Sequence, residues 1–286
     1  MNTVSAIVPT RNRAPLVLRA LASIAAQSRP PEEVIVVDDG STDDVAARVA
    51  AAFPAVRLLR TPPRGVAAAR NAGIAAARGD WLAFLDSDDE WLADKLEAQL
   101  AALAAEPGMA VCHCDEIWIR HHRRVNPRRR HRKSGGRIFQ RCLPLCAISP
   151  SAAVVHRRVF EEVGLFDESF EACEDYELWL RITARWPVLY VDRPLVRKHG
   201  GHADQLSRTV PALDRLRIRA LHKILVAGDL DPGDRRAAVA TLRRKIAVYA
   251  RGVCRRGRHA EAAALARLRD RWAGEVSPER TGQVSS

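Results

Sequence analysis

Short apolar runs that alternate with helix-like segments constrain the fold of this chain more than any other feature. The first run covers residues 4–9, and similar runs at 33–37, 56–60 and 81–85 are each followed by a helix pattern. The helix pattern after the first run has the i, i+3, i+4, i+7 spacing of Val17, Ala20, Leu21 and Ile24. Uninterrupted Val/Ile runs are typical of strands buried on both faces, as in βαβ units. The sequence therefore predicts an α/β fold with a mostly parallel sheet flanked by helices.

The second half of the chain is less regular and ends in helices. Strand patterns lie at 110–119, 150–156 and 188–192, and a helix pattern lies at 174–186. From residue 213 onward Ala and Arg dominate a helical pattern, and the last ten residues are rich in Ser, Gly and Pro. We therefore expect a main domain over 1–210, a helical C-terminal extension over 211–275 and a flexible tail over 276–286.

Positive charge is concentrated in two places. The net charge is +12, but residues 120–137 alone hold nine Lys or Arg and no acid, and residues 211–286 hold 17 basic against eight acidic side chains. The rest of the chain is mildly acidic. A high isoelectric point is therefore no sufficient argument for nucleic-acid binding, although a basic run is typical of nucleic-acid or heparin patches.

The cysteines do not have the spacing of a zinc site. Cys112 and Cys114 alternate on one face of an expected strand, and Cys142 and Cys146 lie one helical turn apart in an apolar stretch. We interpret them as buried thiols that act as small hydrophobes. The chain opens on a strand-like segment rather than a leader, and its apolar runs stop at four or five residues. We therefore expect a cytoplasmic protein with reduced thiols.

Acidic residues directly follow two of the expected strands. Asp38 and Asp39 close the second strand, and Asp86, Asp88 and Asp89 follow the fourth. Ligands of open parallel sheets bind beyond the carboxyl ends of the strands, so we expect these carboxylates to share a ligand or a divalent cation beside a phosphate. The alternative is structural, because Asp and Ser are also favoured in turns and as helix N-caps.

Five short motifs follow one another along the first 181 residues. They are VPTRNR at 8–13, VDDGSTD at 37–43, ARNxG at 69–73, LDSDD at 85–89, and GLFDE at 164–168 followed by EDYELWLR at 174–181. In order and spacing they resemble the signatures of family 2 glycosyltransferases of the Rossmann-like GT-A fold. The resemblance covers residues 3–210 and implies an inverting, metal-dependent enzyme that moves a sugar from a nucleotide-diphospho-sugar to a hydroxyl acceptor.

The resemblance also implies a donor site across the ends of the first four strands. Pro9, Thr10 and Arg13 would line the nucleoside pocket. Asp38 or Asp39 would accept a hydrogen bond from the base, and N3–H of uracil suits that role. We therefore expect a UDP-sugar as the donor.

For the metal, the resemblance points to the D-x-D motif. Asp88 would coordinate Mg²⁺ or Mn²⁺ directly, and Asp86 would contact the ribose or complete the metal shell. Arg70 would lie near the base or the diphosphate. A divalent ion here neutralises the departing diphosphate. His199 or His202, in a glycine-containing segment after the last expected strand, is a candidate third ligand of the metal or diphosphate; the alternative is two exposed loop histidines.

The second-half motif places Glu174 and Asp175 at the start of a helix. Inverting transfer needs one base to take the proton from the attacking acceptor hydroxyl, and the resemblance assigns that role to Asp175 with Glu174 beside it. The alternative is a helix cap stabilised by the helix dipole.

The basic insert at 120–137 falls on the expected acceptor side of the cleft. We expect it to meet a saccharide or lipid-linked acceptor that is anionic, or an anionic membrane surface with peripheral association; the alternative is a solvated loop. Such an enzyme would suit cell-surface polysaccharide or glycolipid synthesis. A sugar-nucleotide nucleotidyltransferase is the alternative enzyme, but it should carry a glycine-rich phosphate loop, and residues 9–13 contain no glycine. A nucleic-acid-binding protein would leave the acidic motifs unexplained, so no nucleic acid is expected.

Overall fold

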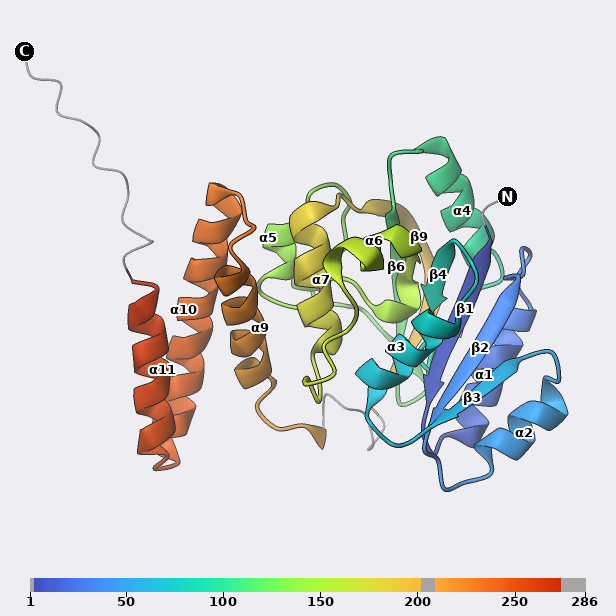
Figure 1. Cartoon of the computed structure of the whole chain (residues 1–286), viewed down its shortest axis with the longest axis horizontal. Helices are drawn as coiled ribbons and strands as arrows, with labels where there is room; N and C mark the ends of the chain where they lie inside the picture. Colours follow the sequence, from blue (N-terminus) through green and yellow to red (C-terminus); the bar gives the residue numbers. More distant parts are fainter. Residues whose placement is uncertain (1–2, 202–208, 274–286) are drawn as a thin grey trace, which may run out of the picture. The chain divides into compact units, whose positions relative to one another are not determined.

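The computed structural model describes residues 3–201 and 209–273, and the expected tail at 276–286 lies outside them. The chain divides into two compact units, Met1–Pro211 and Ala212–Ser286 (Figure 1). The first unit is built on one mixed sheet with the strand order β3-β2-β1-β4-β8-β6-β9-β5, and β7 pairs with β6 outside this order.

The N-terminal half of the sheet is parallel. Its strands are β1 (Val4–Thr10), β2 (Glu33–Asp39), β3 (Arg57–Thr61) and β4 (Trp81–Phe84). They are joined by α1 (Ala14–Ala25), α2 (Val45–Ala52) and α3 (Val66–Ala76). This is the alternation of strand and helix that the apolar runs predict.

The second half makes the sheet mixed. Its strands are β5 (Glu90–Trp91), β6 (Val111–Arg120), β7 (Arg123–Val125), β8 (Ala153–His156) and β9 (Leu189–Gly200), and its helices are α4 (Lys95–Ala105), α5 (Phe139–Cys142), α6 (Arg157–Val163) and α7 (Glu174–Arg185). Two 3₁₀ turns, η1 (Arg129–His131) and η2 (Pro150–Ala152), complete it. Strand β8 is antiparallel to both β4 and β6, and β9 is parallel to β6. The carboxyl ends of β1, β2, β4, β6 and β9 therefore share one edge of the sheet.

Strand β9 differs most from its expectation. The sequence pattern predicts a strand over 188–192 followed by a loop, whereas β9 runs on to Gly200. The ladder with β6 shifts register on both sides of Asp115, which faces Pro194. Proline has no N–H for the ladder and is tolerated in a strand at such irregularities. The strand therefore resumes after the proline and carries Lys198 and His199 to the carboxyl edge.

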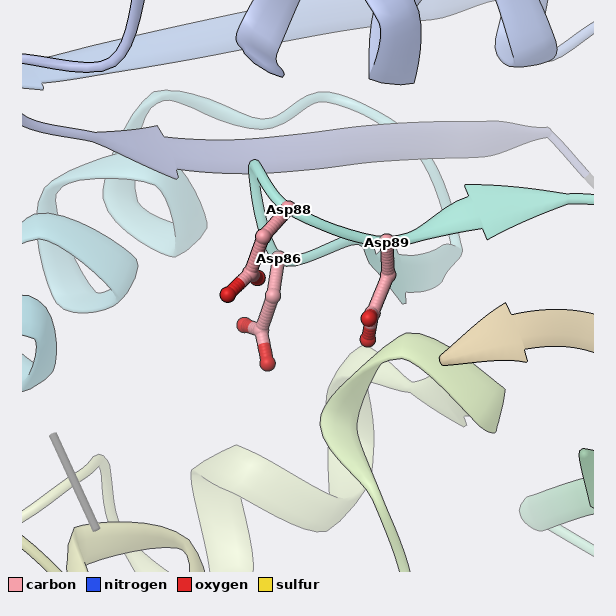
Figure 2. Close-up of side chains that lie close together, drawn as sticks. All are labelled: Asp86, Asp88 and Asp89. Atoms are coloured by element: carbon pink, nitrogen blue, oxygen red, sulfur yellow. The ribbon is translucent and has the colours of Figure 1, made fainter. Parts of the chain in front are cut away.

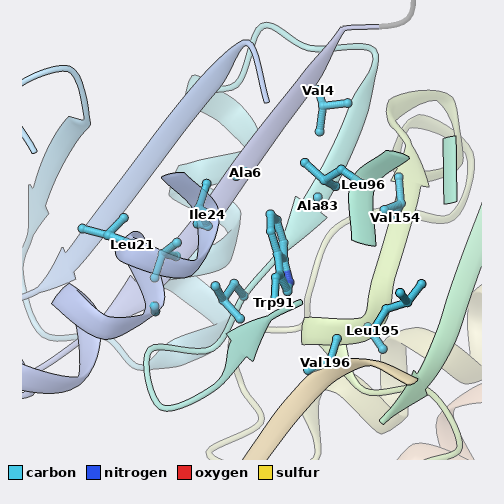
Figure 3. Close-up of a cluster of buried hydrophobic side chains, with 14 of the residues drawn as sticks. Val4, Ala6, Leu21, Ile24, Ala83, Trp91, Leu96, Val154, Leu195 and Val196 are labelled. Carbon is cyan, nitrogen blue, oxygen red and sulfur yellow. The ribbon is translucent and has the colours of Figure 1, made fainter. Parts of the chain in front are cut away.

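The core of the first unit lies between the sheet and the helices that cover it. Figure 3 shows members of this cluster from the strands (Val4, Ala6, Ala83, Leu195 and Val196), from α1 (Leu21 and Ile24) and from β5 and α4 (Trp91 and Leu96). Cys112 and Cys114 are fully buried in the same cluster and are free thiols. Their interpretation as small hydrophobes in a strand agrees with this packing.

The second unit is helical, as its sequence pattern predicts. It contains α9 (Leu213–Ala227), α10 (Pro232–Arg255) and α11 (His259–Arg271). Gly228 ends α9 at a φ of +86°, a conformation that glycine adopts without strain, and Pro232 starts α10 in the first turn, where no N–H is needed. Among the described residues of either unit, no helix has the length and apolar character needed to span a membrane.

Candidate active site

Three aspartates gather in the loop between β4 and β5. Carboxylate oxygens of Asp86, Asp88 and Asp89 lie within 4.8 Å of one another, and Figure 2 shows the side chains leaving the loop on the same side. The loop is held by the backbone N–H of Asp86, which donates to Ser151 Oγ at 3.1 Å, and by the N–H of Asp89, which donates to the Asp86 carbonyl at 2.9 Å. Oxygen-only donors at this spacing suit Mg²⁺ or Mn²⁺.

Asp89 is the buried member of the group. Its Oδ2 accepts a hydrogen bond from Ser151 Oγ at 2.7 Å and its Oδ1 accepts one from the backbone N–H of His199 at 2.9 Å. Burial raises the pKa of Asp89 well above its usual value, and the charge of Asp88 adds to this effect. A cation bound to the group would offset both effects, because a nearby positive charge favours the ionised form of a carboxylate.

Arg70 of α3 joins this loop to the second half of the unit. Its side chain is 3% exposed and donates to Asp86 Oδ1 at 2.6 Å and to Glu174 Oε1 at 2.7 Å. Burial alone would lower the pKa of Arg70, but Asp86 and Glu174 together raise it. The guanidinium therefore stays charged and ties the acidic loop to the first residue of α7.

Glu174 and Asp175 have different surroundings although they are adjacent. Glu174 is buried, and its carboxylate is engaged by Arg70. Asp175 is half-buried; its Oδ1 accepts the backbone N–H of Tyr176 at 2.6 Å, and its Oδ2 accepts the thiol of Cys146 at 3.2 Å. Within the part of the chain that the structure describes, Glu174 is thus the carboxylate committed to an arginine, and Asp175 is bound by weaker, uncharged donors.

The ends of β1 and β2 carry the expected donor residues. Pro9 and Thr10 are buried, and Thr10 Oγ1 has no hydrogen-bond partner in the described structure. Both oxygens of Asp39 already accept backbone N–H groups, from Arg64 at 2.8 Å and Gly65 at 2.9 Å. Asp38 Oδ1 accepts the N–H of Ser41, whereas its buried Oδ2 accepts no hydrogen bond and faces Arg60 Nε at 3.6 Å.

Arg13 lies against the acidic loop. Its Nη1 is 3.3 Å from Asp88 Oδ2, so the side chain that the resemblance puts in the nucleoside pocket contacts a candidate metal ligand.

His199 belongs to β9 and not to a loop. Its ring Nε2 is 2.6 Å from Glu90 Oε1, and burial lowers its pKa while Glu90 acts in the opposite direction. It is not a member of the aspartate group found among the described residues. His202 lies outside those residues, so the choice between the two histidines as a third ligand stays a prediction.

Lys198 is a charged group of the site that sequence reasoning missed. Its Nζ donates to Ser149 Oγ at 3.0 Å. Burial lowers its pKa, but Glu116, Asp89 and Asp86 more than offset this and raise it. A resident cation therefore stands beside the carboxylates. The sequence held one hint of this role, because Lys198 directly precedes the candidate ligand His199. Its position in a strand was hidden by Pro194, past which β9 continues.

The basic insert is anchored to β6. Lys133 Nζ lies 2.8 Å from Glu116 Oε1, and the Trp118 and His131 rings contact one another at a tilt of 59°, with centroids 5.1 Å apart. Burial alone would raise the pKa of Glu116, but the charges of Lys133 and Lys198 outweigh burial and lower this pKa to about 2. The side chain of Lys133 is therefore buried in an ion pair, unlike the arginines of the insert. Eight arginines of the insert are exposed: Arg120, Arg123, Arg124, Arg128, Arg129, Arg130, Arg132 and Arg137.

The insert also lies near the acidic loop in the sheet. Trp118, Ile119 and Arg120 of β6 pair with Lys198, His199 and Gly200 of β9. Since the N–H of His199 donates to Asp89, the start of the insert is one strand away from the aspartate group.

Comparison with known proteins gives one consistent result. The model of the family described as glycosyl transferase family 2 matches residues 5–164. An uncharacterized glycosyltransferase of Rickettsia felis is 31% identical over 208 residues, which is 69% of this chain and 33% of that protein. The succinoglycan biosynthesis protein ExoO of Rhizobium meliloti is 44% identical over 119 residues, which is 41% of this chain and 34% of that protein. The chain thus spans about a third of the length of these two relatives.

A solved structure shows the same fold. The crystal structure of residues 1–349 of S. aureus TarS in complex with UDP-GlcNAc superposes with a TM-score of 0.70. The superposition covers 86% of this chain and 73% of that one at 21% sequence identity. The expected α/β fold of the GT-A type, with helices flanking the sheet, is therefore confirmed.

Proposed function

The chain belongs to glycosyltransferase family 2, and we propose that it transfers a sugar from a UDP-sugar to a hydroxyl acceptor with inversion and with the help of a divalent cation. One observation carries the proposal. Arg70 joins the aspartate loop to the start of α7, so candidate metal ligands and the candidate base Asp175 share one edge of the sheet.

The donor proposal is supported by buried polar atoms without hydrogen-bond partners. Thr10 Oγ1 makes no hydrogen bond in the described structure, and Asp38 Oδ2 makes none either, although Arg60 Nε lies 3.6 Å from it. A buried polar atom without a hydrogen bond is costly unless a ligand satisfies it. Asp38 Oδ2 suits a base N–H better than Asp39, whose two oxygens are in use. Uracil N3–H fits this acceptor, and the related TarS fold is known with UDP-GlcNAc.

The metal proposal is supported by the donor set. Asp88 and Asp86 are candidate direct ligands of Mg²⁺ or Mn²⁺, and Asp89 is added to them by the geometry. A bound divalent ion supplies charge neutralisation for the departing diphosphate. Lys198 and Arg70 are fixed cations beside these carboxylates, where they limit the repulsion within the loop.

The base proposal separates the two carboxylates at the start of α7. Glu174 holds Arg70, so we assign it a positioning role in place of the catalytic role that the resemblance suggested. Asp175 takes the proton of the acceptor hydroxyl as that oxygen bonds to the anomeric carbon. The bond from this carbon to the diphosphate oxygen breaks on the opposite face, UDP leaves with the bonding pair, and the configuration is inverted.

The acceptor proposal is supported by the exposed arginines of the insert. We propose an acceptor that carries negative charge on its saccharide or on the lipid to which it is linked, and peripheral attachment to an anionic membrane follows from the same charges. The insert is ordered by Lys133 and Trp118 and starts one strand from Asp89. At a membrane surface each arginine contributes about 1 kcal/mol.

A donor panel tests the function. Thermal unfolding is followed with UDP, UDP-GlcNAc, UDP-glucose, UDP-galactose, GDP and ADP, each with Mn²⁺ and with EDTA. We expect stabilisation by uridine nucleotides with Mn²⁺, because a ligand that binds the native state raises its stability by mass action. UDP release from the stabilising UDP-sugar, with water as a slow acceptor, then measures chemistry. A nucleotidyltransferase would instead release pyrophosphate from UTP and a sugar phosphate.

A matched pair of variants tests the basic surface. Changing Arg128, Arg129, Arg130 and Arg132 to Gln should release the protein from phosphatidylglycerol vesicles, because it removes the charges that attract the anionic surface. The comparison is made at low salt, since surface charges are screened over about 10 Å at 0.1 M. The control changes four exposed arginines of the second unit to Gln: Arg236, Arg251, Arg255 and Arg256. Equal sedimentation of both variants would show that the insert does not hold the membrane. Steep salt-dependent binding of a polynucleotide by the wild type only would support the nucleic-acid alternative.

A further inference from the structure

The segment between α5 and η2 packs on the start of α7. Tyr176 OH donates to the Leu143 carbonyl at 2.6 Å, and both groups are buried. Three residues further along, Cys146 Sγ lies 3.2 Å from Asp175 Oδ2 and 3.1 Å from the Ile148 carbonyl oxygen. Ile148 is fully buried, so the thiol is held on a fixed piece of backbone.

The carboxylate of Asp175 is contacted on both oxygens, but by unlike donors. Oδ1 accepts the N–H of Tyr176 at 2.6 Å, a contact within the same helix turn. Oδ2 accepts the Cys146 thiol, which comes from a segment 29 residues away in sequence. The thiol therefore fixes the direction of Oδ2 relative to the rest of the site.

The thiol is the proton donor of this pair. Burial raises the pKa of Cys146 well above its usual value, and the charge of Asp175 raises it further, while Lys198 acts in the opposite direction. The other titratable or charged groups around the pair are Glu174, which holds Arg70, and Cys142 on α5. At neutral pH the sulfur carries its hydrogen, and one S–H can point to one acceptor at a time.

We propose that Cys146 is a positioning residue for the sugar-transfer base: its S–H holds Oδ2 of Asp175 in place before transfer and turns to the Ile148 carbonyl once Asp175 has taken the acceptor's proton. This inference rests on the proposed function of Asp175. The thiol itself gains and loses no proton in the cycle. A weak donor suits the task, because a strong hydrogen bond would stabilise the carboxylate anion and make it a poorer base.

Two variants of Cys146 separate position from packing. Cys146→Ala removes the donor and should lower the rate of UDP release from the UDP-sugar by about 10- to 100-fold, as expected for a misplaced catalytic group. Its KM for the donor should not change, because Asp175 does not bind the nucleotide. Cys146→Ser restores a donor in the same place and should recover most of the rate. Since a hydroxyl is the stronger donor, the acid limb of its kcat profile should move to lower pH.

Cys142→Ala is the control for packing. Cys142 is buried at the end of α5, four residues before Cys146, and its thiol contacts the Thr183 hydroxyl in place of Asp175. It should leave the rate of UDP release unchanged even where its melting temperature falls. The proposal is overturned if Cys146→Ala keeps the wild-type rate, or if both alanine variants lose rate and stability together and Cys146→Ser rescues neither.

Different experimental results would refute the role of Cys146 and the proposed function. If the wild type releases no UDP from any UDP-sugar, the proposed function fails. If Asp175→Asn keeps the wild-type rate, the assignment of Asp175 as the base fails, and the role of Cys146 fails with it. If Asp175→Asn loses the rate but Cys146→Ala does not, the function stands and the positioning role of the thiol is refuted.

Discussion

Lys95 at the start of α4 offers a quantitative test of the electrostatics of this fold. Its side chain is fully buried, and its Nζ has no hydrogen-bond partner in the described structure. The ammonium lies 4.0 Å from the centroid of the Trp91 ring. Burial lowers the pKa of Lys95 from 10.5 to about 8. A charged lysine in this core therefore costs stability, and the neighbouring π face offsets a part of that cost.

The magnitude follows from the pKa shift. A shift of one unit corresponds to about 1.4 kcal/mol, so keeping Lys95 charged in the core costs about 3 kcal/mol at pH 7. A desolvated cation–π contact returns about 1–2 kcal/mol. Lys95→Met removes the charge and keeps the length of the side chain. We expect it to raise the free energy of unfolding at pH 7 by about 1–2 kcal/mol.

The lowered pKa of Lys95 also determines how the stability of the wild type changes with pH. The pKa is lower in the folded state, so the penalty is fully present below pH 8. Between about pH 8 and 10.5 the folded protein releases the proton first, the unfolded chain binds more protons, and wild-type stability rises with pH. The advantage of Lys95→Met should therefore be largely lost between pH 7 and pH 10.

Urea unfolding of wild type and Lys95→Met at both pH values makes the measurement. Burial raises the pKa values of the neighbouring Cys112 and Cys114 thiols to about 12 and about 11, and Lys95 acts in the opposite direction on both. Both thiols therefore stay protonated in the folded protein at pH 7 and at pH 10, with or without Lys95. Exposed Lys223→Met is the matched control and should show no pH-dependent gain. A destabilised Lys95→Met, or a gain that is the same at pH 7 and pH 10, would refute the reasoning.

Two further predictions concern the acidic groups. Asp88→Asn should weaken Mn²⁺-dependent binding of UDP, measured by calorimetry, and leave the melting temperature within a few degrees, because it keeps the volume but loses an anionic oxygen; unchanged affinity would remove Asp88 from the metal site. Glu174→Gln should lower the free energy of unfolding by about 3 kcal/mol, because it leaves Arg70 buried with one carboxylate partner in place of two; a loss below about 0.5 kcal/mol, typical of surface changes, would show that the pair does not tie α7 to the aspartate loop.

Sequence alone predicts those site residues whose position follows from the strand or helix pattern directly beside them. Asp86 and Asp88 follow a buried apolar run, and Asp175 starts a helix pattern, so the local pattern alone assigns each of them to the end of a strand or helix. Their order along the chain then supports the family resemblance. The family is confirmed, whereas the roles of the single residues remain proposals.

The contacts that sequence reasoning missed depend on long-range packing. Cys146 and Asp175 are 29 residues apart, and Lys133 reaches Glu116 across the turn of a hairpin. Lys198 looked like a loop residue because Pro194 interrupts the strand pattern before it. The nine basic residues of the insert give no local sign that one of them, Lys133, is buried in an ion pair with Glu116. Tertiary contacts decided these cases, and no local pattern encodes them.

The most direct test of the central claim compares binding with chemistry in Asp175→Asn. Calorimetry with UDP and Mn²⁺ measures donor binding, and UDP release from the UDP-sugar measures the reaction. The account predicts wild-type affinity for UDP and a rate lower by about 10²–10⁴-fold, the usual contribution of a general base. Wild-type UDP release by Asp175→Asn would contradict it.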